Sequence, residues 1–302
     1  MGERVEIVDV GPRDGLQAQP QLLDTDTKLA LIERLVEAGV RRLEVASFVS
    51  PERVPQMADA DAIIARLPRH AGVSYIGLVL NDQGMERALA AGVEQINCAA
   101  VTTDSFCLRN QGKTAAEMLE VIAGLARRAQ DAKKFFSVTI AAAFGCPFEG
   151  EVAPATVVAI AQRLYAMGVN EIALADTIGV AVPSEVKRLV EAVRPHLGAT
   201  PLRMHFHNTR GTAIGNVYAA VESGVRIIDA SVGGVGGCPF APGATGNVGT
   251  EDVLYLLHRM GYETGIDITK LIATSKWLEG PLAAPMQASM TRASVFPPPR
   301  AA

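Results

Sequence analysis

The chain has 302 residues, of which 49% are hydrophobic and 20% are charged, so it can bury a large core and is neither disordered nor a coiled coil. Its 28 Lys and Arg residues against 32 Asp and Glu residues give a formal net charge of −4. This balance argues against a nucleic acid or an anionic membrane surface as the partner.

The first predicted strand covers residues 5–10, close to the start of the chain. This leaves no room for a signal or transit peptide in the chain as given, and no apolar run reaches the roughly 18 residues that a bilayer requires. The four cysteines show no pairing pattern, which fits a reducing compartment. We therefore expect a cytoplasmic protein that does not enter a membrane.

A phrase that ends in Gly-Val occurs four times along the chain. Glycine supplies the left-handed residue that ends a helix, and the following Val enters a strand buried on both faces. The glycines are Gly39, Gly92, Gly168 and Gly224, and the strands that follow them are predicted at 42–46, 95–99, 171–175 and 227–231.

The distance between successive glycines is long enough for two strand–helix units. Further strands are predicted at 5–10, 74–78, 136–140 and 202–206, with helices at 27–38, 115–132, 154–167, 183–193 and 213–223. Eight such units close into a (β/α)8 TIM barrel. The alternative, a doubly wound open sheet, needs a G-x-G-x-x-G fingerprint after the first strand, and this sequence has Gly-Pro-Arg-Asp-Gly there.

We therefore predict an α/β protein with a single TIM-barrel catalytic domain over residues 1–295. Additional C-terminal helices are predicted at 250–260 and 268–277, and a disordered tail at 296–302, which contains three consecutive prolines.

In a barrel, the active site lies at the carboxyl ends of the strands. Arg13 and Asp14 follow the first strand, where the alternative is a tight turn with a solvated ion pair. Glu44 lies among apolar residues in the second strand, so it requires a cationic or hydrogen-bonding partner. Asp176 ends the sixth strand and is a candidate for orienting a bound water or a substrate hydroxyl.

His205 and His207 end the seventh strand, and the period of two places both imidazoles on one face. In a closed barrel, only the eighth strand separates the seventh strand from the first. Asp14 can therefore add a carboxylate ligand to the two imidazoles. Nitrogen and oxygen ligands without thiolates favour Mg²⁺, Mn²⁺ or a related divalent ion over Zn²⁺. The alternative is that the histidines are structural.

A glycine-rich stretch over residues 232–247 follows the eighth strand and includes Cys238. A thiol on a lid over a metal site is a candidate proton donor or acceptor, whereas a plain connector or phosphate cradle would explain only the glycines. Asn247 and Glu251 begin the next helix, where a helix cap and a first-turn acid are the alternatives.

Over nearly its whole length, the chain resembles the 3-hydroxy-3-methylglutaryl-CoA lyase family of metal-dependent TIM-barrel enzymes. The most specific similarity lies in residues 10–17, 47–51, 54–57, 145–150, 176–180 and 236–241. The last of these segments is similar to the loop that distinguishes the lyases from related Claisen-condensing enzymes.

The resemblance implies a role for each matching residue. It makes Asp14, His205, His207 and Asn247 the metal ligands, and Arg13 the group that stabilises the enolate of acetyl-CoA. Cys238 becomes the loop thiol that takes part in proton transfer. The resemblance also implies supporting catalytic positions for Glu44, Asp176 and Glu251, and substrate-binding positions for Gln17, Asn110, Thr139 and Arg210.

Two segments depart from the family's pattern. Residues 205–211 read His-Phe-His-Asn-Thr-Arg-Gly, so Arg210 replaces a tyrosine and Asn208 an aspartate. Thr139 and Ala141 are smaller or less aromatic than usual. Arg210 is thus a candidate for binding a substrate carboxylate in a new position, and the alternative is that it points outward into an ion pair.

The expected function is cleavage of 3-hydroxy-3-methylglutaryl-CoA to acetyl-CoA and acetoacetate with a divalent ion. One alternative is the same mechanism on a related 3-hydroxyacyl-CoA such as citramalyl-CoA, giving pyruvate. Another is a Claisen-condensing acyltransferase, and a non-catalytic binding barrel is a further class. We expect a homodimer that binds a small acyl-CoA and neither nucleic acid nor membrane.

Overall fold

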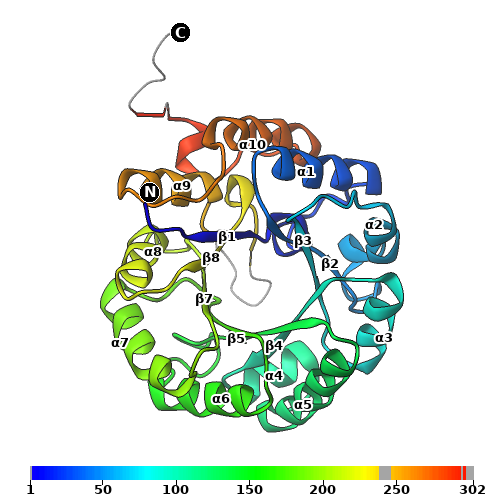
Figure 1. Cartoon of the computed structure of the whole chain (residues 1–302), viewed down its shortest axis with the longest axis vertical. Helices are drawn as coiled ribbons and strands as arrows, with labels where there is room; N and C mark the ends of the chain where they lie inside the picture. Colours follow the sequence, from blue (N-terminus) through cyan, green and yellow to red (C-terminus); the bar gives the residue numbers. More distant parts are fainter. Residues whose placement is uncertain (1, 238–245, 294, 297–302) are drawn as a thin grey trace.

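A computed structural model of the chain describes residues 2–237, 246–293 and 295–296. Eight parallel strands form a closed barrel in sequence order, and β8 pairs with β1 to close it. Figure 1 shows the helices as a ring around these strands. The strands are β1 (Glu6–Asp9), β2 (Arg42–Ser47), β3 (Ser74–Leu78), β4 (Gln95–Val101), β5 (Phe135–Ala141), β6 (Glu171–Asp176), β7 (Leu202–Phe206) and β8 (Ile227–Ala230). The TIM-barrel prediction is confirmed, with every predicted strand in place.

The helices alternate with the strands as the sequence indicates, except that α4 is inserted before α5 in the connection from β4 to β5. They are α1 (Thr25–Glu37), α2 (Ala60–Arg66), α3 (Asp82–Ala91), α4 (Asp104–Gln111), α5 (Ala115–Asp131), α6 (Pro154–Ala166), α7 (Pro183–Val193), α8 (Ala213–Glu222), α9 (Thr250–Arg259) and α10 (Ile268–Leu282). α9 follows β8 and packs against α8, so it completes the eighth unit. α10 is the added C-terminal helix, and it packs on α1 and α9.

The four glycines of the repeated phrase all have positive φ. The angles are +105° at Gly39, +82° at Gly92, +72° at Gly168 and +83° at Gly224. This left-handed conformation is open to glycine at little cost, and it turns the chain from each helix into the next strand. The repeat therefore has the conformational basis that the sequence predicts.

A row of charged side chains runs through the barrel interior, where apolar side chains usually fill the space. Arg42 Nη1 lies 2.9 Å from Glu171 Oε2, and Glu171 Oε1 lies 3.2 Å from Arg203 Nε. Arg203 Nη1 then lies 3.3 Å from Asp229 Oδ1. These four residues, which we call the ionic chain, are all less than 10% exposed and connect the start of β2 with β8 near the barrel mouth.

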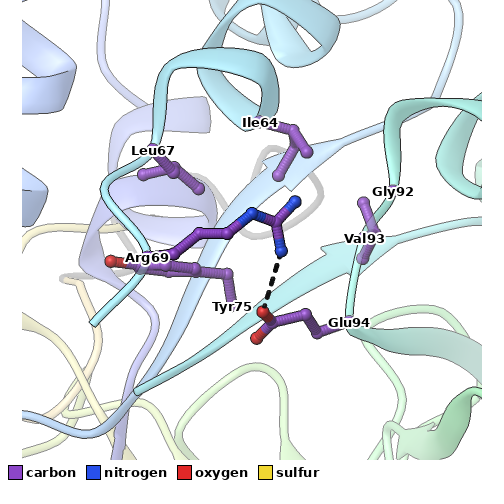
Figure 2. Close-up of a pocket in the computed structure, with 7 residues that line it drawn as sticks. All are labelled: Ile64, Leu67, Arg69, Tyr75, Gly92, Val93 and Glu94. Atoms are coloured by element: carbon purple, nitrogen blue, oxygen red, sulfur yellow. Dashed lines mark hydrogen bonds and ion pairs between the residues drawn. The ribbon is translucent and has the colours of Figure 1, made fainter. Parts of the chain in front are cut away.

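The end of the barrel where the strands begin carries a small pocket of about 20 Å³. Figure 2 shows Arg69 crossing it to reach Glu94, with 3.4 Å between Nη1 and Oε1. Tyr75 at the start of β3 and Gly92 at the end of α3 also line it. Its volume suits about one water, and it lies far along the strands from their carboxyl ends, so it is a structural feature rather than the site.

None of the helices in the described part of the chain is both long enough and apolar enough to cross a membrane. Of the predicted disordered tail at 296–302, only Phe296 falls within the described residues.

Candidate active site

Arg13 and Asp14 lie in a short π-helical turn, residues Gly11–Gly15, that begins directly after β1. Arg13 Nη1 donates to Asp14 Oδ1 at 2.8 Å, and Arg13 Nη2 donates to Glu44 Oε2. The Arg13 side chain is only 11% exposed, so this is a largely buried cluster rather than a solvated turn. Arg13 is the cationic partner that the sequence required for Glu44.

The other oxygen of Glu44 is also bonded. Asn97 Nδ2 donates to Glu44 Oε1 at 3.2 Å and lies equally far from Thr139 Oγ1 on β5. Arg203 Nη2 approaches Asn97 Oδ1 at 3.4 Å. The side chains behind Arg13 therefore form a continuous hydrogen-bonded layer across the barrel, with Thr139 in it.

The two histidines extend from the end of β7 on the same face, with 5.2 Å between their ring centroids. One ligand atom from each of Asp14, His205 and His207 lies within 4.8 Å of the others. The backbone of His207 bridges to Asn247, and Asn247 Nδ2 donates to Asp14 Oδ2 at 2.9 Å. The structure thus brings together all four residues that the resemblance makes metal ligands; we call them the ligand group.

Two buried atoms of the ligand group fit a bound cation. Among the described residues, His207 Nδ1 and Asn247 Oδ1 have no hydrogen-bond partner. The amide NH₂ of Asn247 donates to Asp14 Oδ2 and to Val235 O, and its side-chain carbonyl oxygen is left to bind an ion. Buried lone pairs without a partner are costly, and a divalent ion bound by nitrogen, carboxylate and amide oxygen would remove that cost.

The pKa values of Asp14 and His207 also favour a bound cation. Burial raises the pKa of Asp14, but the charges of Arg13 and the two histidines outweigh it and lower the value to about 2. Burial, with repulsion from His205, lowers the pKa of His207 to about 4. Near neutral pH both side chains therefore present unprotonated ligand atoms, the form that binds metal.

Asp176 and Arg210 both bind the segment that follows β6. The Asp176 carboxylate accepts from the backbone N–H of Val180 at 2.9 Å and of Ala181 at 3.0 Å. Arg210 Nη1 donates to the carbonyls of Ile178 at 2.9 Å and Gly179 at 3.0 Å. Within the described residues, Arg210 forms no outward ion pair; it joins the segment after β7 to the segment after β6.

Glu251 lies at the base of the glycine-rich segment and not in the ligand group. Both of its carboxylate oxygens lie 3.0 Å from the backbone N of Gly233, and burial raises its pKa to about 8. Cys238 lies outside the described residues. Glu251 thus holds Gly233, a residue that precedes Cys238 in the sequence.

A polar cavity of about 150 Å³ lies beside Asn247. Asn208 and Thr209, which follow β7, form one part of its wall, and Gln287 and Ala288, which follow α10, form another. The segment after α10 is held there because Gly233 O accepts from the backbone N–H of Gln287 at 2.8 Å and of Ala288 at 3.0 Å. The added helix therefore carries residues to the neighbourhood of the ligand group.

Two predicted substrate-binding residues are less closely connected to the other predicted site residues. Gln17 follows the turn that bears Asp14, and its buried Oε1 has no hydrogen-bond partner among the described residues. Asn110 lies on α4, and in the described part of the chain it makes no hydrogen bond to any other predicted site residue. The structure therefore leaves both as predictions.

Sequence reasoning missed Asp229, Arg203 and Asn97. Asp229 Oδ2 lies 3.2 Å from His205 Nδ1, and the other two residues lie directly behind Arg13 and Glu44. A signal was present, because Arg203 precedes His205 by two positions and therefore shares its face of the strand. A charged residue inside an apolar strand is a second signal.

Comparison with known proteins gives consistent matches. The family model described as HMGL-like matches residues 4–278. The chain is 44% identical to a hydroxymethylglutaryl-CoA lyase of Pseudomonas mevalonii, over 88% of each chain. It is 42% identical to an (R)-citramalyl-CoA lyase of Chloroflexus aurantiacus, over 98% of this chain and 96% of the relative. A solved HMG-CoA lyase of Acinetobacter baumannii, in complex with coenzyme A and 3-methylmalate, superposes with a TM-score of 0.94 at 37% identity, over 97% and 96% of the chains.

Proposed function

The chain belongs to the HMGL-like family and is a carbon–carbon lyase, and from this premise we propose that it cleaves 3-hydroxy-3-methylglutaryl-CoA to acetyl-CoA and acetoacetate. The observation that carries the proposal is the ligand group of Asp14, His205, His207 and Asn247 directly beside Arg13. Mg²⁺ or Mn²⁺ is the proposed ion, because the donors are nitrogen and oxygen atoms.

The reaction has a simple balance of atoms and electrons. The C3 hydroxyl loses its proton, the C2–C3 bond breaks, and C3 becomes the ketone of acetoacetate. The bonding electron pair moves to C2 and is delocalised onto the thioester oxygen as an enolate. A proton delivered to C2 then completes acetyl-CoA.

Negative charge on the thioester oxygen is the main electrostatic demand of this reaction. When bound, a divalent ion supplies Lewis-acid polarisation of the substrate hydroxyl. Arg13 supplies the fixed cation for the enolate, and Glu44 and Asp14 hold its guanidinium by one N–H group each. Because the cluster is largely buried, the guanidinium need not reorganise while the charge develops.

The remaining roles follow from position and resemblance. Asp176 and Glu251 hold the segments after β6 and β8, and Cys238 is proposed to exchange the proton at C2. Gln17, Asn110, Thr139 and Arg210 are proposed to contact the acyl-CoA. Kinetics of single variants at these positions test the assignments.

A second candidate is the same cleavage of citramalyl-CoA to pyruvate and acetyl-CoA. The relative named (R)-citramalyl-CoA lyase is 42% identical across nearly all of both chains, which is as similar as the hydroxymethylglutaryl-CoA lyase. Arg210 and Thr139, where the chain departs from the lyase pattern, belong to the part of the site that would distinguish the two acyl groups.

The deciding experiment supplies each acyl-CoA in turn, with Mg²⁺ and with EDTA, to wild type and to Cys238→Ala. We expect acetoacetate from 3-hydroxy-3-methylglutaryl-CoA, abolished by EDTA and reduced at least about 100-fold in the variant. If citramalyl-CoA gave pyruvate and 3-hydroxy-3-methylglutaryl-CoA gave no acetoacetate, the second candidate would replace the first. Condensation of acetyl-CoA with an oxo acid, without cleavage of either substrate, would reassign the protein as a Claisen-condensing enzyme.

We also propose that the protein is a cytoplasmic homodimer. Cysteine usage supports a reducing compartment, since Cys98, Cys107 and Cys146 are buried free thiols. Closed two-fold dimers are the commonest assembly of soluble enzymes. Light scattering coupled to size exclusion gives the mass in solution, and a mass near 31.9 kDa would indicate a monomer instead.

A further inference from the structure

The structure assigns Asp229 a positioning role toward the proposed metal. We infer that Asp229 fixes His205 in the tautomer with a proton on Nδ1, which leaves Nε2 free to bind the ion. The inference rests on the proposed metal-dependent function and concerns a residue outside the predicted site.

The contact joins two neighbouring strands in register. Asp229 on β8 and His205 on β7 are paired Cα partners, and Asp229 Oδ2 lies 3.2 Å from His205 Nδ1. The side chains are 5% and 12% exposed, so water competes little for the bond. An ionised carboxylate only accepts, so Nδ1 must donate, and a neutral imidazole then carries its lone pair on Nε2.

Arg203 holds Asp229 in place from the other side. Its Nη1 lies 3.3 Å from Asp229 Oδ1, while its Nε lies 3.2 Å from Glu171 Oε1. Arg203 is 1% exposed, and it shares the inner face of β7 with His205. Arg203 therefore forms an ion pair with one oxygen of Asp229 while His205 contacts the other oxygen, and this links the ionic chain to a proposed metal ligand.

This arrangement makes asparagine an informative substitution. An amide has one acceptor and one donor end, whereas Arg203 and His205 Nδ1 both present donors to position 229. The buried guanidinium cannot give up its protons, so the amide oxygen is expected to face Arg203 and the amide NH₂ to face His205. The proton of His205 then moves to Nε2, the atom needed for the ion.

The first test measures Mn²⁺ affinity by electron paramagnetic resonance of the full chain. Loss of the carboxylate partner of a metal-binding histidine typically weakens metal affinity 10- to 100-fold, and we expect this for Asp229→Asn. Glu171→Gln is the matched control, since it removes a charge from the same ionic chain without touching His205. We expect it to bind Mn²⁺ within about 3-fold of wild type; equal losses in both variants would overturn the inference.

The second test observes the tautomer directly. The chain has five histidines, so ¹⁵N-histidine labelling gives few signals, and His205→Gln assigns the one needed. At a pH where His205 is neutral, we expect its proton on Nδ1 in metal-free wild type and on Nε2 in Asp229→Asn. A neutral ring with its only proton on Nε2 in wild type would overturn the inference even if Asp229→Asn does not fold.

The two tests separate this inference from the function on which it rests. If wild type bound no Mn²⁺, the proposed metal-dependent function would be wrong. The tautomer of His205 in wild type would still test its contact with Asp229. If wild type and Asp229→Asn bound Mn²⁺ with equal affinity, the inference about Asp229 would be wrong and the proposed function would stand.

Discussion

The role of Arg13 depends on the two carboxylates that hold it. Asp14 and Glu44 each accept from a different terminal nitrogen, so the planar fork is fixed in one orientation. Asp14 is at the same time a member of the ligand group, which places the cation beside the proposed metal. A lysine would retain the charge and lose this two-point attachment.

We therefore expect Arg13→Lys to lower kcat by about 100-fold, the scale of losing an organised electrostatic contact in a buried site. Mn²⁺ affinity should stay within a few-fold, because all four proposed ligands remain. Steady-state kinetics together with Mn²⁺ titration check this. A kcat near that of wild type would show that the fork geometry is unimportant.

Glu251 predicts a pH dependence of stability. Burial raises its pKa to about 8 in the folded protein, against 4.5 for the unperturbed group. Between these values the folded state holds a proton that the unfolded state has released, so stability falls as pH rises, by up to about 1.4 kcal/mol per pH unit. We expect Glu251→Gln to flatten the decline in Tm between pH 5 and pH 8. Parallel Tm curves for the two proteins would contradict the assignment.

At the scale of the elements, the glycines between helix and strand are not equivalent. Gly39 has a φ of +105°, and a Cβ there would lie 2.4 Å from the backbone oxygen of Gly265. Gly92, with a φ of +82°, has open space, and its nearest neighbour is Arg69 Nη2 at 3.9 Å. Gly39 therefore serves both a left-handed turn and a close backbone approach, and Gly92 serves only the turn.

This difference predicts unequal costs for one substitution. Gly92→Ala should lower the free energy of unfolding by about 1–2 kcal/mol, the cost of the left-handed conformation. Gly39→Ala should cost at least about 2 kcal/mol more, because the backbone must move. Urea unfolding of both variants measures the difference, and equal losses would show that the contact with Gly265 relaxes without cost.

At the scale of the whole molecule, the site assembles from segments at both ends of the chain. Asp14 comes from the first unit, the histidines from the seventh, and Asn247 from the segment before α9. Barrel closure through β8 and β1 makes these segments neighbours. The ligand group is therefore a link between the two ends of the fold, and its occupancy should affect stability.

We expect Mg²⁺ or Mn²⁺ to raise Tm, and EDTA to abolish the rise. An ion that binds only the folded state adds about 2.7 kcal/mol at 100 times its Kd. For a chain of this length, that is a shift of several degrees by differential scanning calorimetry. His207→Ala should show no shift; an equal shift in that variant would place the bound ion elsewhere.

The sequence alone determined the architecture and the end of the barrel at which the candidate site residues gather. The Gly-Val repeat predicted eight units, because a helix must end in a left-handed residue before a buried strand begins, and this is a local requirement. The proximity of Asp14, His205 and His207 was also predictable, because the carboxyl ends of barrel strands meet at one place, whereas Asn247 was added to them by the family resemblance. The assignment of α9 as an added helix was wrong, since the long segment before it conceals that it belongs to the eighth unit.

Only the tertiary structure decided which side chains become partners. Arg210 faces the carbonyls after β6, and Asp229 faces His205, although sequence position gives neither pairing. The ionic chain likewise needs β2 placed across the barrel from β6, and β6, β7 and β8 side by side in register. Local rules specify where a strand begins and which face is buried, whereas a contact between distant segments depends on the register and closure of the whole barrel.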